Sequence, residues 1–482
     1  MAKKVIMKPI AMDNYPALEK RPLPKPPHWS KAIGVGIVVM GLGIGTGELI
    51  LWPHLVTKHG LTLLWLALLG IGFQYFINKE VARHEVATGE GFFTTSARVV
   101  QWSVFFWLFA AIILYIWPAW ASAIGTTLTE LFGFGTHLIW SWATLVLVLV
   151  LTFSGRVAYT MLEKSLKITV PTFFILLVAI SFFNLSLADV GAALKGIVSF
   201  GTIPEGVNTF VLLSAVVFAG AGGMLNLAVS LWYRDKQVGM GSYIGRVTNP
   251  ITGRNEAVSA TGYTFDMDNA ENMKNWRAWM RYVNIDQGII FFALGFTTLV
   301  LLATNAYAVL TPKGLVPEGL DIAVVQAHIF GDVLGPIGFK LFLVMAFLML
   351  FSVMWTVIDA LTRIVSDIIY TNARAGKYKK AFSKFERFSI GQLYYGTIII
   401  VALLGAVLVL FEQPLTLLVI SGVLSGLSMA LYTPFLIYIN NTRLAKPLRP
   451  SFFTNFVMVL ISVFFAYFSY RVVLEAFYKL FG

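Results

Sequence analysis

Glu48 is the first residue whose chemical type stands out, because it is a carboxylate within a long apolar segment. It directly follows the stretch 41–47, in which every second residue is glycine. A second stretch, 218–226, holds three glycines together with Met224 and Asn226. Carboxylate oxygens and thioether sulfurs are metal donors, and free N–H groups at helix N-termini bind anions. The two stretches therefore indicate a binding site for a small ion or a small molecule.

The composition decides what kind of protein carries these stretches. Hydrophobic residues make up 57% of the 482 residues and charged residues only 12%. Soluble domains carry about 25% charged residues, so an ordinary soluble protein is excluded. The absence of cysteine excludes disulfides and thiolate metal sites. The composition therefore predicts an all-α integral membrane protein that is embedded in the lipid bilayer.

Apolar runs long enough to cross a bilayer need roughly 20 residues. Eleven such spans are predicted, numbered one to eleven along the chain, at 32–57, 61–78, 102–128, 137–154, 165–185, 208–232, 284–304, 336–358, 391–411, 414–439 and 452–475. The basic, proline-rich segment 1–31 is predicted to be an unstructured tail. Segment 233–283 is predicted to be a polar insert, with a short hairpin around 249–254.

The distribution of basic residues predicts the orientation. With the N-terminus inside, the segments on the cytoplasmic face hold 29 of the 36 Lys and Arg residues. Lys and Arg translocate poorly, so a multi-pass protein of an inner or plasma membrane with a cytoplasmic N-terminus is expected. This bias also explains the net charge of +12 without a nucleic-acid partner.

The two glycine-rich stretches lie near the middle of spans one and six. Each glycine costs a helix about 1 kcal/mol relative to alanine, so both spans are predicted to be broken there. Spans one and six correspond if 32–185 and 208–439 are inverted repeats of five spans each, leaving 452–475 outside. Paired broken helices mark the central site of a secondary transporter. Two tightly packed helices without a ligand are the alternative.

The predicted substrate-binding residues come from both stretches. Glu48 is central, because a carboxylate in the bilayer is costly and usually functional; it could also cap the second half of span one. His54 is predicted to line an external vestibule. The full predicted substrate-binding set is Gly45, Thr46, Gly47, Glu48, Ala221, Gly222, Met224 and Asn226.

Three further charges lie at one end of span eight. Asp359, Arg363 and Asp367 are spaced i, i+4 and i+8 on one helix face. This spacing predicts an inner gate or a structural ladder of ion pairs.

The sequence resembles the Nramp family of divalent-metal transporters, which share the LeuT fold. The resemblance lies in several short motifs along the chain. They are Gly60-Leu61-Thr62-Leu63-Leu64-Trp65, Ala87-Thr88-Gly89, Gly220-Ala221 with Met224, and Arg281-Tyr282 with Ile285-Asp286. The resemblance implies a LeuT-type bundle and a secondary transporter, a symporter, of divalent metal cations.

The chain also departs from the family pattern. The family's Asp-Pro-Gly-Asn motif in the first helix falls on 45–48, so Gly45 and Glu48 take the liganding positions. The Met-Pro-His motif of the sixth helix falls on 224–226. The acidic pair of the third helix, tied in the family to proton movement, falls near Ala119 and Ser122.

Two substrates fit these residues. Glu48 and Met224, with backbone carbonyls near Gly45 and Ala221, could hold a divalent cation. Alternatively, N–H groups at 45–47 and 220–223 could hold the carboxylate of a small organic substrate such as an amino acid. The cation is preferred, and no separate cofactor is expected.

An enzyme and a channel are the remaining classes. The six histidines show no i, i+4 pair and no His-Glu-x-x-His motif, and no Gly-x-Ser-x-Gly elbow occurs. The chain is therefore not expected to be an enzyme. Paired broken helices favour alternating access over a pore, with spans one, two, six and seven rocking against the others.

Overall fold

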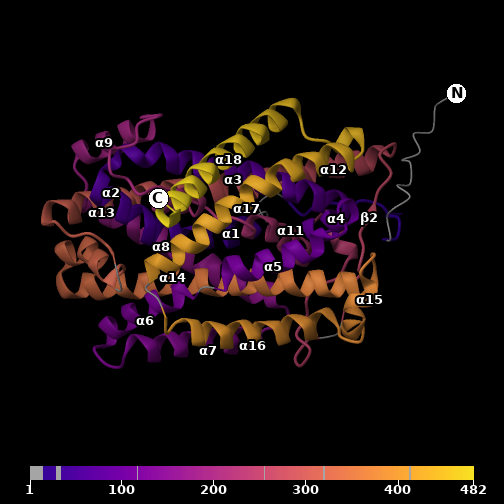
Figure 1. Cartoon of the computed structure of the whole chain (residues 1–482), viewed down its shortest axis with the longest axis horizontal. Coiled ribbons are helices and arrows are strands. Elements are labelled where there is room, and N and C mark those ends of the chain that lie inside the picture. The colour runs from indigo at the N-terminus through magenta and orange to yellow at the C-terminus, as the bar shows by residue number, and fades with distance from the viewer. Residues whose placement is uncertain are drawn as a thin grey trace.

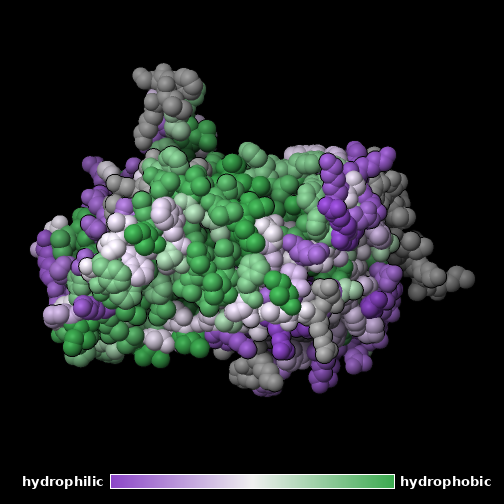
Figure 2. All heavy atoms as spheres, turned by 90° about the horizontal axis from the view of Figure 1, so that it is seen from below, coloured by the Kyte–Doolittle hydropathy of each residue, from purple (hydrophilic) through white to green (hydrophobic). Residues whose placement is uncertain are grey.

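The structure is a computed structural model that describes residues 15–28, 34–116, 118–253, 256–318, 321–411 and 414–481. Long helices run side by side along the long axis of the molecule (Figure 1). An apolar belt covers much of one face, with hydrophilic residues concentrated toward the ends (Figure 2). This belt is expected for a bundle whose exposed flanks face lipid instead of water.

The first half of the chain forms the helices of spans one to five. Their bounds, with short connecting helices, are α1 Val35–Gly43, η2 Ile44–Leu51, α2 Trp52–His59, η3 Leu61–Leu63, α3 Leu64–Thr88, α4 Phe92–Val99, α5 Ser103–Tyr115, α6 Ala119–Phe132, α7 His137–Ser154, α8 Ala158–Asn184 and α9 Leu187–Ile197.

The second half contains spans six to eleven. Its elements are α10 Thr209–Val217, α11 Leu225–Asp235, η4 Gly239–Tyr243, α12 Ala270–Ile285, η5 Asp286–Leu294, α13 Gly295–Leu310, η6 Thr311–Lys313, η8 Val325–Ala327, α14 His328–Arg374, α15 Lys379–Phe382, η9 Ser383–Phe385, α16 Ile390–Leu408, α17 Pro414–Thr442, η10 Lys446–Leu448 and α18 Phe452–Phe481. Gly335, with φ of 63°, kinks α14 ahead of Pro336.

Ten helices in the described ranges are long and apolar enough to cross a membrane. They coincide with ten of the eleven predicted spans. Span six is the exception, because it is divided into α10 and α11 by residues 218–224, which we call the span-six break. Gly222 and Gly223 adopt φ of 78° and 56°, which non-glycine residues rarely adopt. The predicted break in span six is therefore confirmed.

The predicted break in span one is wrong. Val35–His59 runs as one helix, in which α1 passes into the π-helix η2 and then into α2. A π-helix changes the hydrogen-bond ladder from i→i−4 to i→i−5 without unwinding it. The apolar core of this span is entirely buried, so span one lies at the centre of the bundle.

Span three, counted among the ten as Ser103–Phe132, is interrupted around Pro118, where α5 ends and α6 begins. Proline lacks an N–H group and disrupts the preceding turn. The division brings two side chains of span three toward the centre, Tyr115 at the end of α5 and Trp120 at the start of α6. Both are buried.

The prediction of an unstructured tail is wrong for its described part, 15–28. Strand β1 (Glu19–Lys20) pairs in parallel with β2 (Tyr263–Thr264) of the insert. Leu23 is buried, and its backbone hydrogen-bonds with Asn272 and Asn275 of the insert. Tail and insert therefore pack together at one end of the bundle.

The predicted hairpin around 249–254 is wrong as far as it is described. Asn249 accepts hydrogen bonds at its side chain from the N–H groups of Ile251 and Thr252. This is an Asx-type turn. Thr248 makes a single bridge to Val157, and Arg254 lies outside the described residues.

Candidate functional site

Spans one and six meet at the predicted site. A Cβ atom on Gly47 would lie 1.9 Å from the carbonyl oxygen of Phe218, and one on Gly43 would lie 3.4 Å from the Cα of Gly220. On another face of η2, a Cβ on Gly45 would lie 2.6 Å from Val353 of α14. The glycines of span one therefore permit close helix packing. Span one thus shows the close packing of the alternative, and it also contacts the span-six break.

The span-six break is held by side chains from three other spans. Tyr115 donates to the carbonyl of Gly222 at 3.0 Å and accepts from the N–H of Leu225 at 3.2 Å. Tyr432 of α17 donates to the carbonyl of Gly223 at 3.0 Å. Gln74 of α3 accepts from the N–H of Gly222 at 2.8 Å. These backbone groups of the break are therefore satisfied by protein side chains and not by a ligand.

Glu48 lies within η2 and is 1% exposed. Its Oε2 atom is buried without a hydrogen-bond partner. No ion pair among the described residues involves Glu48. A buried carboxylate oxygen without a partner is energetically costly, and binding of a cation or a proton by Glu48 would remove this cost.

Asn226 lies in the first turn of α11 and is fully buried. Its amide nitrogen donates to Asn78 at 2.8 Å and to Gln74 at 3.3 Å. Its Oδ1 atom is also buried and has no hydrogen-bond partner. The predicted site therefore contains a second free acceptor oxygen.

The other predicted members are also buried. Met224 is fully buried directly before α11. Thr46 donates to the carbonyl of Leu42 and accepts from the indole N–H of Trp120 at 2.9 Å. Within the described ranges, no group of three or more His, Asp or Glu side chains is arranged to hold a metal, so a metal would also need amide, carbonyl or thioether donors.

A chain of hydrogen bonds links the break to the start of span one; we call it the polar chain. From Asn226 it continues through Asn78 to Gln287 of η5 at 3.1 Å. Gln287 donates to Tyr233 at 3.0 Å, and Tyr233 donates to Asp286 at 2.7 Å. Asp286 accepts from the backbone N–H groups of Gly34 and Gly36. The polar chain thus joins spans one, two, six and seven.

His54, predicted to line the external vestibule, lies beneath the loop after η6. Its Nδ1 atom is 2.8 Å from the carbonyl oxygen of Pro317, and the side chain is 6% exposed. The adjacent Lys58 forms a 2.8 Å ion pair with Glu318. The loop therefore covers His54 in this structure, and its place in an external vestibule stays a prediction.

The predicted ladder on α14 pairs differently from its spacing. Arg363 does bond Asp359, at 2.6 Å, but its second partner is Asp235 of α11. Asp367 pairs with Arg234 of α11. The predicted pair of Asp359 with Arg363 is therefore present, whereas Asp367 pairs with Arg234 and not with Arg363. Two cross-links join spans six and eight.

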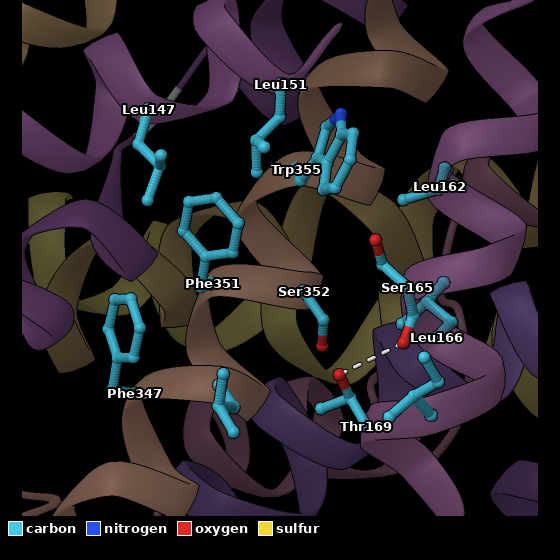
Figure 3. Close-up of a pocket in the computed structure, with 12 residues that line it drawn as sticks. Leu147, Leu151, Leu162, Ser165, Leu166, Thr169, Phe347, Phe351, Ser352 and Trp355 are labelled. Carbon is cyan, nitrogen blue, oxygen red and sulfur yellow. Dashed lines mark hydrogen bonds between the residues drawn. The ribbon is translucent and has the colours of Figure 1, made fainter. Parts of the chain in front are cut away.

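A separate cavity of about 330 Å³ lies between α7, α8 and α14. Figure 3 shows that Leu147, Phe347, Phe351 and Trp355 line it, with Thr169 bonded to the carbonyl of Ser165. Its rim residue Ile168 is 72% exposed on the lipid-facing flank. None of the predicted site residues lines it.

Sequence reasoning missed Gln74, Tyr115 and Tyr432, which hold the break, and Asn78 and Gln287, which belong to the polar chain. Gln74 and Asn78 give a signal, because they are i, i+4 polar residues inside an apolar span. Pro118 similarly signals the division of span three. No local pattern identifies Tyr115 or Tyr432, because their contacts join distant segments.

Comparisons with known proteins concern the family and the fold of the chain. The profile of the family described as natural resistance-associated macrophage protein-like (Nramp) matches residues 36–475. A comparison with curated proteins finds no match.

Solved structures show the same fold at low identity. A manganese transporter of Eremococcus coleocola, in a mutant form, superposes with a TM-score of 0.66 at 12% identity over 98% of this chain and 92% of its own. The same transporter bound to an aromatic bis-isothiourea substituted compound superposes equally well, at 13% identity over the same shares of the two chains. MhsT in complex with L-phenylalanine superposes with a TM-score of 0.57 at 17% identity over 93% and 99%.

Proposed function

This chain belongs to the Nramp family and has the LeuT fold, and on that premise we propose that it carries a divalent metal cation across the membrane by alternating access. The similar structures from Eremococcus coleocola are named as a manganese transporter, which makes Mn²⁺ the first cation to test. Family membership also supports a membrane carrier over an enzyme.

The observation that carries the cation is the pair of free acceptors. Glu48 Oε2 and Asn226 Oδ1 are both buried without hydrogen-bond partners. Glu48 directly follows the glycine-rich stretch of span one, and Asn226 ends the glycine-rich stretch of span six. Oxygen donors suit hard and intermediate cations, and the thioether of Met224 shifts the preference toward softer ones. We propose these three side chains as metal ligands, with backbone carbonyls of the span-six break.

The break itself also favours a positive ligand. Residues 218–221 follow the C-terminus of α10, where the helix dipole presents partial negative charge. Among the described residues, no hydrogen bond is accepted by the carbonyl oxygens of Ala219, Gly220 or Ala221. Those carbonyls remain able to coordinate a cation.

The organic alternative has fewer donors than the sequence predicts. It requires free N–H groups at 45–47, but these residues lie inside η2. At the start of α11, the N–H groups of Leu225, Asn226 and Leu227 donate to carbonyls three residues earlier. Gly222 donates to Gln74. Among the described hydrogen bonds, the N–H groups of Gly220, Ala221 and Gly223 have no acceptor, so the donors that remain for a carboxylate lie in the span-six break and not in span one.

The hydrogen bonds and ion pairs between spans indicate which spans move together in the proposed transport cycle. The polar chain ties spans one, two, six and seven into one group. This group is bonded to span three through the indole of Trp120, which donates to Thr46. It is bonded to span eight through the ion pairs that Asp235 and Arg234 form with α14. Inward opening would break the cross-links at α14, which act as the inner gate, and outward opening would release the loop from His54.

The remaining assignments follow the same proposal. The repeats are 32–185 and 208–439, with 452–475 as an additional span, and the N-terminus lies in the cytoplasm. Ala119 and Ser122 are buried and cannot titrate. If a proton accompanies the metal, as in a symporter, Glu48 is the carboxylate of the proposed site that can carry it.

Uptake into proteoliposomes tests this function. We expect proteoliposomes that contain the purified protein to take up Mn²⁺ at a rate that saturates with Mn²⁺ concentration. The Glu48→Gln variant should elute in size-exclusion chromatography as a folded protein but should show no uptake. Glu205→Gln is the matched control, because Glu205 is exposed in a loop outside the bundle. Unchanged uptake in Glu48→Gln, or flux that never saturates, would contradict the proposal.

A further inference from the structure

A basic pocket lies where α3, α12 and α18 meet, away from the proposed metal site. It has a volume of about 510 Å³, within the range of small-ligand pockets. Four of its lining residues are cationic, namely Lys79, Arg83, Arg277 and Arg281, and the others are Trp276, Met280, Asn284, Ser451 and Thr454. None of the described residues that line it carries a carboxylate.

Most of this positive charge is not neutralised. Arg83 is paired with Glu80 at 2.9 Å and also donates to the carbonyl of Leu448. Lys79 lies over the rings of Tyr75 and Phe76, at 5.9 and 5.8 Å from their centroids. Arg277 and Arg281 are exposed one helical turn apart on α12. Lys79 and Arg83 therefore share one carboxylate, Glu80, and no described ion pair involves Arg277 or Arg281. The excess of positive charge favours an anionic ligand.

The position of the pocket identifies the source of that anion. Ser451 directly precedes α18 and Thr454 lies in its first turn, at the end of a membrane-spanning helix. Next to them, Phe452 and Phe453 are 88% and 64% exposed. Phe453 also contacts the ring of Phe76 beside Lys79, at 6.2 Å between centroids. Polar and apolar surfaces thus adjoin as they do at a membrane interface.

We propose that this basic pocket binds the phosphate head group of an anionic phospholipid, whose acyl chains lie against Phe452 and Phe453. The cations hold the phosphate, and Asn284, Ser451 and Thr454 supply neutral hydrogen-bond donors. Basic pockets between membrane helices recognise lipid head groups in this way. The positive-inside bias accounts for basic residues at this end of the bundle, but not for their convergence in one concave pocket.

The bound lipid would hold a segment that also belongs to the transport machinery. Helix α12 runs without interruption into η5, whose first residue, Asp286, accepts the N–H groups of Gly34 and Gly36 at the start of span one. Fixing α12 therefore fixes one end of the polar chain.

Native mass spectrometry of the full-length protein, titrated with phosphatidylglycerol or phosphatidylcholine of identical chains, tests the proposal. We expect tighter binding of phosphatidylglycerol, and about 30-fold weaker binding after the double substitution Arg277→Gln and Arg281→Gln, since each basic residue near an anionic head group contributes about fivefold. The control, Lys380→Gln with Lys384→Gln, removes the same charge from exposed residues near α15 at the same end of the bundle (Figure 1) and should bind as the wild type does.

Three results would overturn the proposal. The two lipids could bind equally, the pocket variant could bind phosphatidylglycerol as tightly as the control variant, or inorganic phosphate could displace the lipid at an equal concentration. The last result would assign the pocket to a free anion. Equal thermal unfolding temperatures of the two variants confirm that the comparison concerns binding and not folding.

Discussion

Gly47 of η2 lies so close to Phe218 of the span-six break that a single methyl group would not fit between them. A Cβ on Gly47 would approach the carbonyl oxygen of Phe218 to 1.9 Å. A backbone oxygen cannot rotate away as a flexible side chain can, so this contact fixes the distance between spans one and six. The same contact places Glu48, the next residue, beside the break.

The substitution Gly47→Ala tests this contact. We expect it to destabilise the protein by about 1–3 kcal/mol through overpacking and to abolish Mn²⁺ uptake, because the two halves of the site are forced apart. Gly396→Ala is the matched control, since a Cβ at helical Gly396 would meet nothing within 4 Å. Thermal unfolding and proteoliposome uptake measure both effects, and wild-type uptake by Gly47→Ala would refute the role of the contact.

The tyrosines that hold the break should matter even though neither is a proposed ligand. Tyr115 and Tyr432 each bond a carbonyl of the break at 3.0 Å. We expect Tyr115→Phe and Tyr432→Phe each to cost about 1 kcal/mol of stability and to raise the KM for Mn²⁺. Tyr438→Phe, at a half-exposed position on the same helix as Tyr432, should do neither. If the KM for Mn²⁺ is unchanged in both Tyr115→Phe and Tyr432→Phe, these tyrosines do not position the span-six break for metal binding.

The loop over His54 should respond to acid only at low pH. The hydrogen bond and charge of Lys58 hold the pKa of Glu318 below its ordinary value of 4.5. The ion pair therefore persists above that ordinary pKa and is lost as the pH falls through the lowered pKa.

Hydrogen–deuterium exchange measures this response. After correction for intrinsic rates, exchange in 314–318 should be constant between about pH 8 and about pH 6 and should rise below about pH 4. In Glu318→Gln it should be faster at neutral pH by less than about fivefold, because exposed ion pairs contribute little. A rise with acid that persists in Glu318→Gln would exclude this ion pair as its cause.

Hydropathy predicted most of the fold, because burial in lipid demands long apolar helices whatever they contact. Ten predicted spans coincide with helices in the described ranges, and Gly222 and Gly223 mark the break in span six through backbone angles that other residues rarely adopt. The π-helix of span one was not predictable from its glycines. A glycine needed for close packing and a glycine needed for unwinding look the same in a sequence.

The site was predictable in part for a similar reason. Glu48 is conspicuous because a carboxylate in an apolar span has few structural explanations. The residues that hold the span-six break come from spans far away in the sequence, so spacing alone could not connect Tyr115 and Tyr432 to the predicted site. The partners of Arg363 and Asp367 illustrate the same limit, since Asp235 and Arg234 lie on another helix.

The most direct measurement is the anomalous scattering of manganese in crystals of the wild-type protein grown with Mn²⁺. The account predicts one strong anomalous peak between η2 and the span-six break, in contact with Glu48 and with Asn226 or a carbonyl of 219–221, and predicts its loss in Glu48→Gln. A peak elsewhere in the bundle, or the same peak retained in Glu48→Gln, would contradict the proposed site.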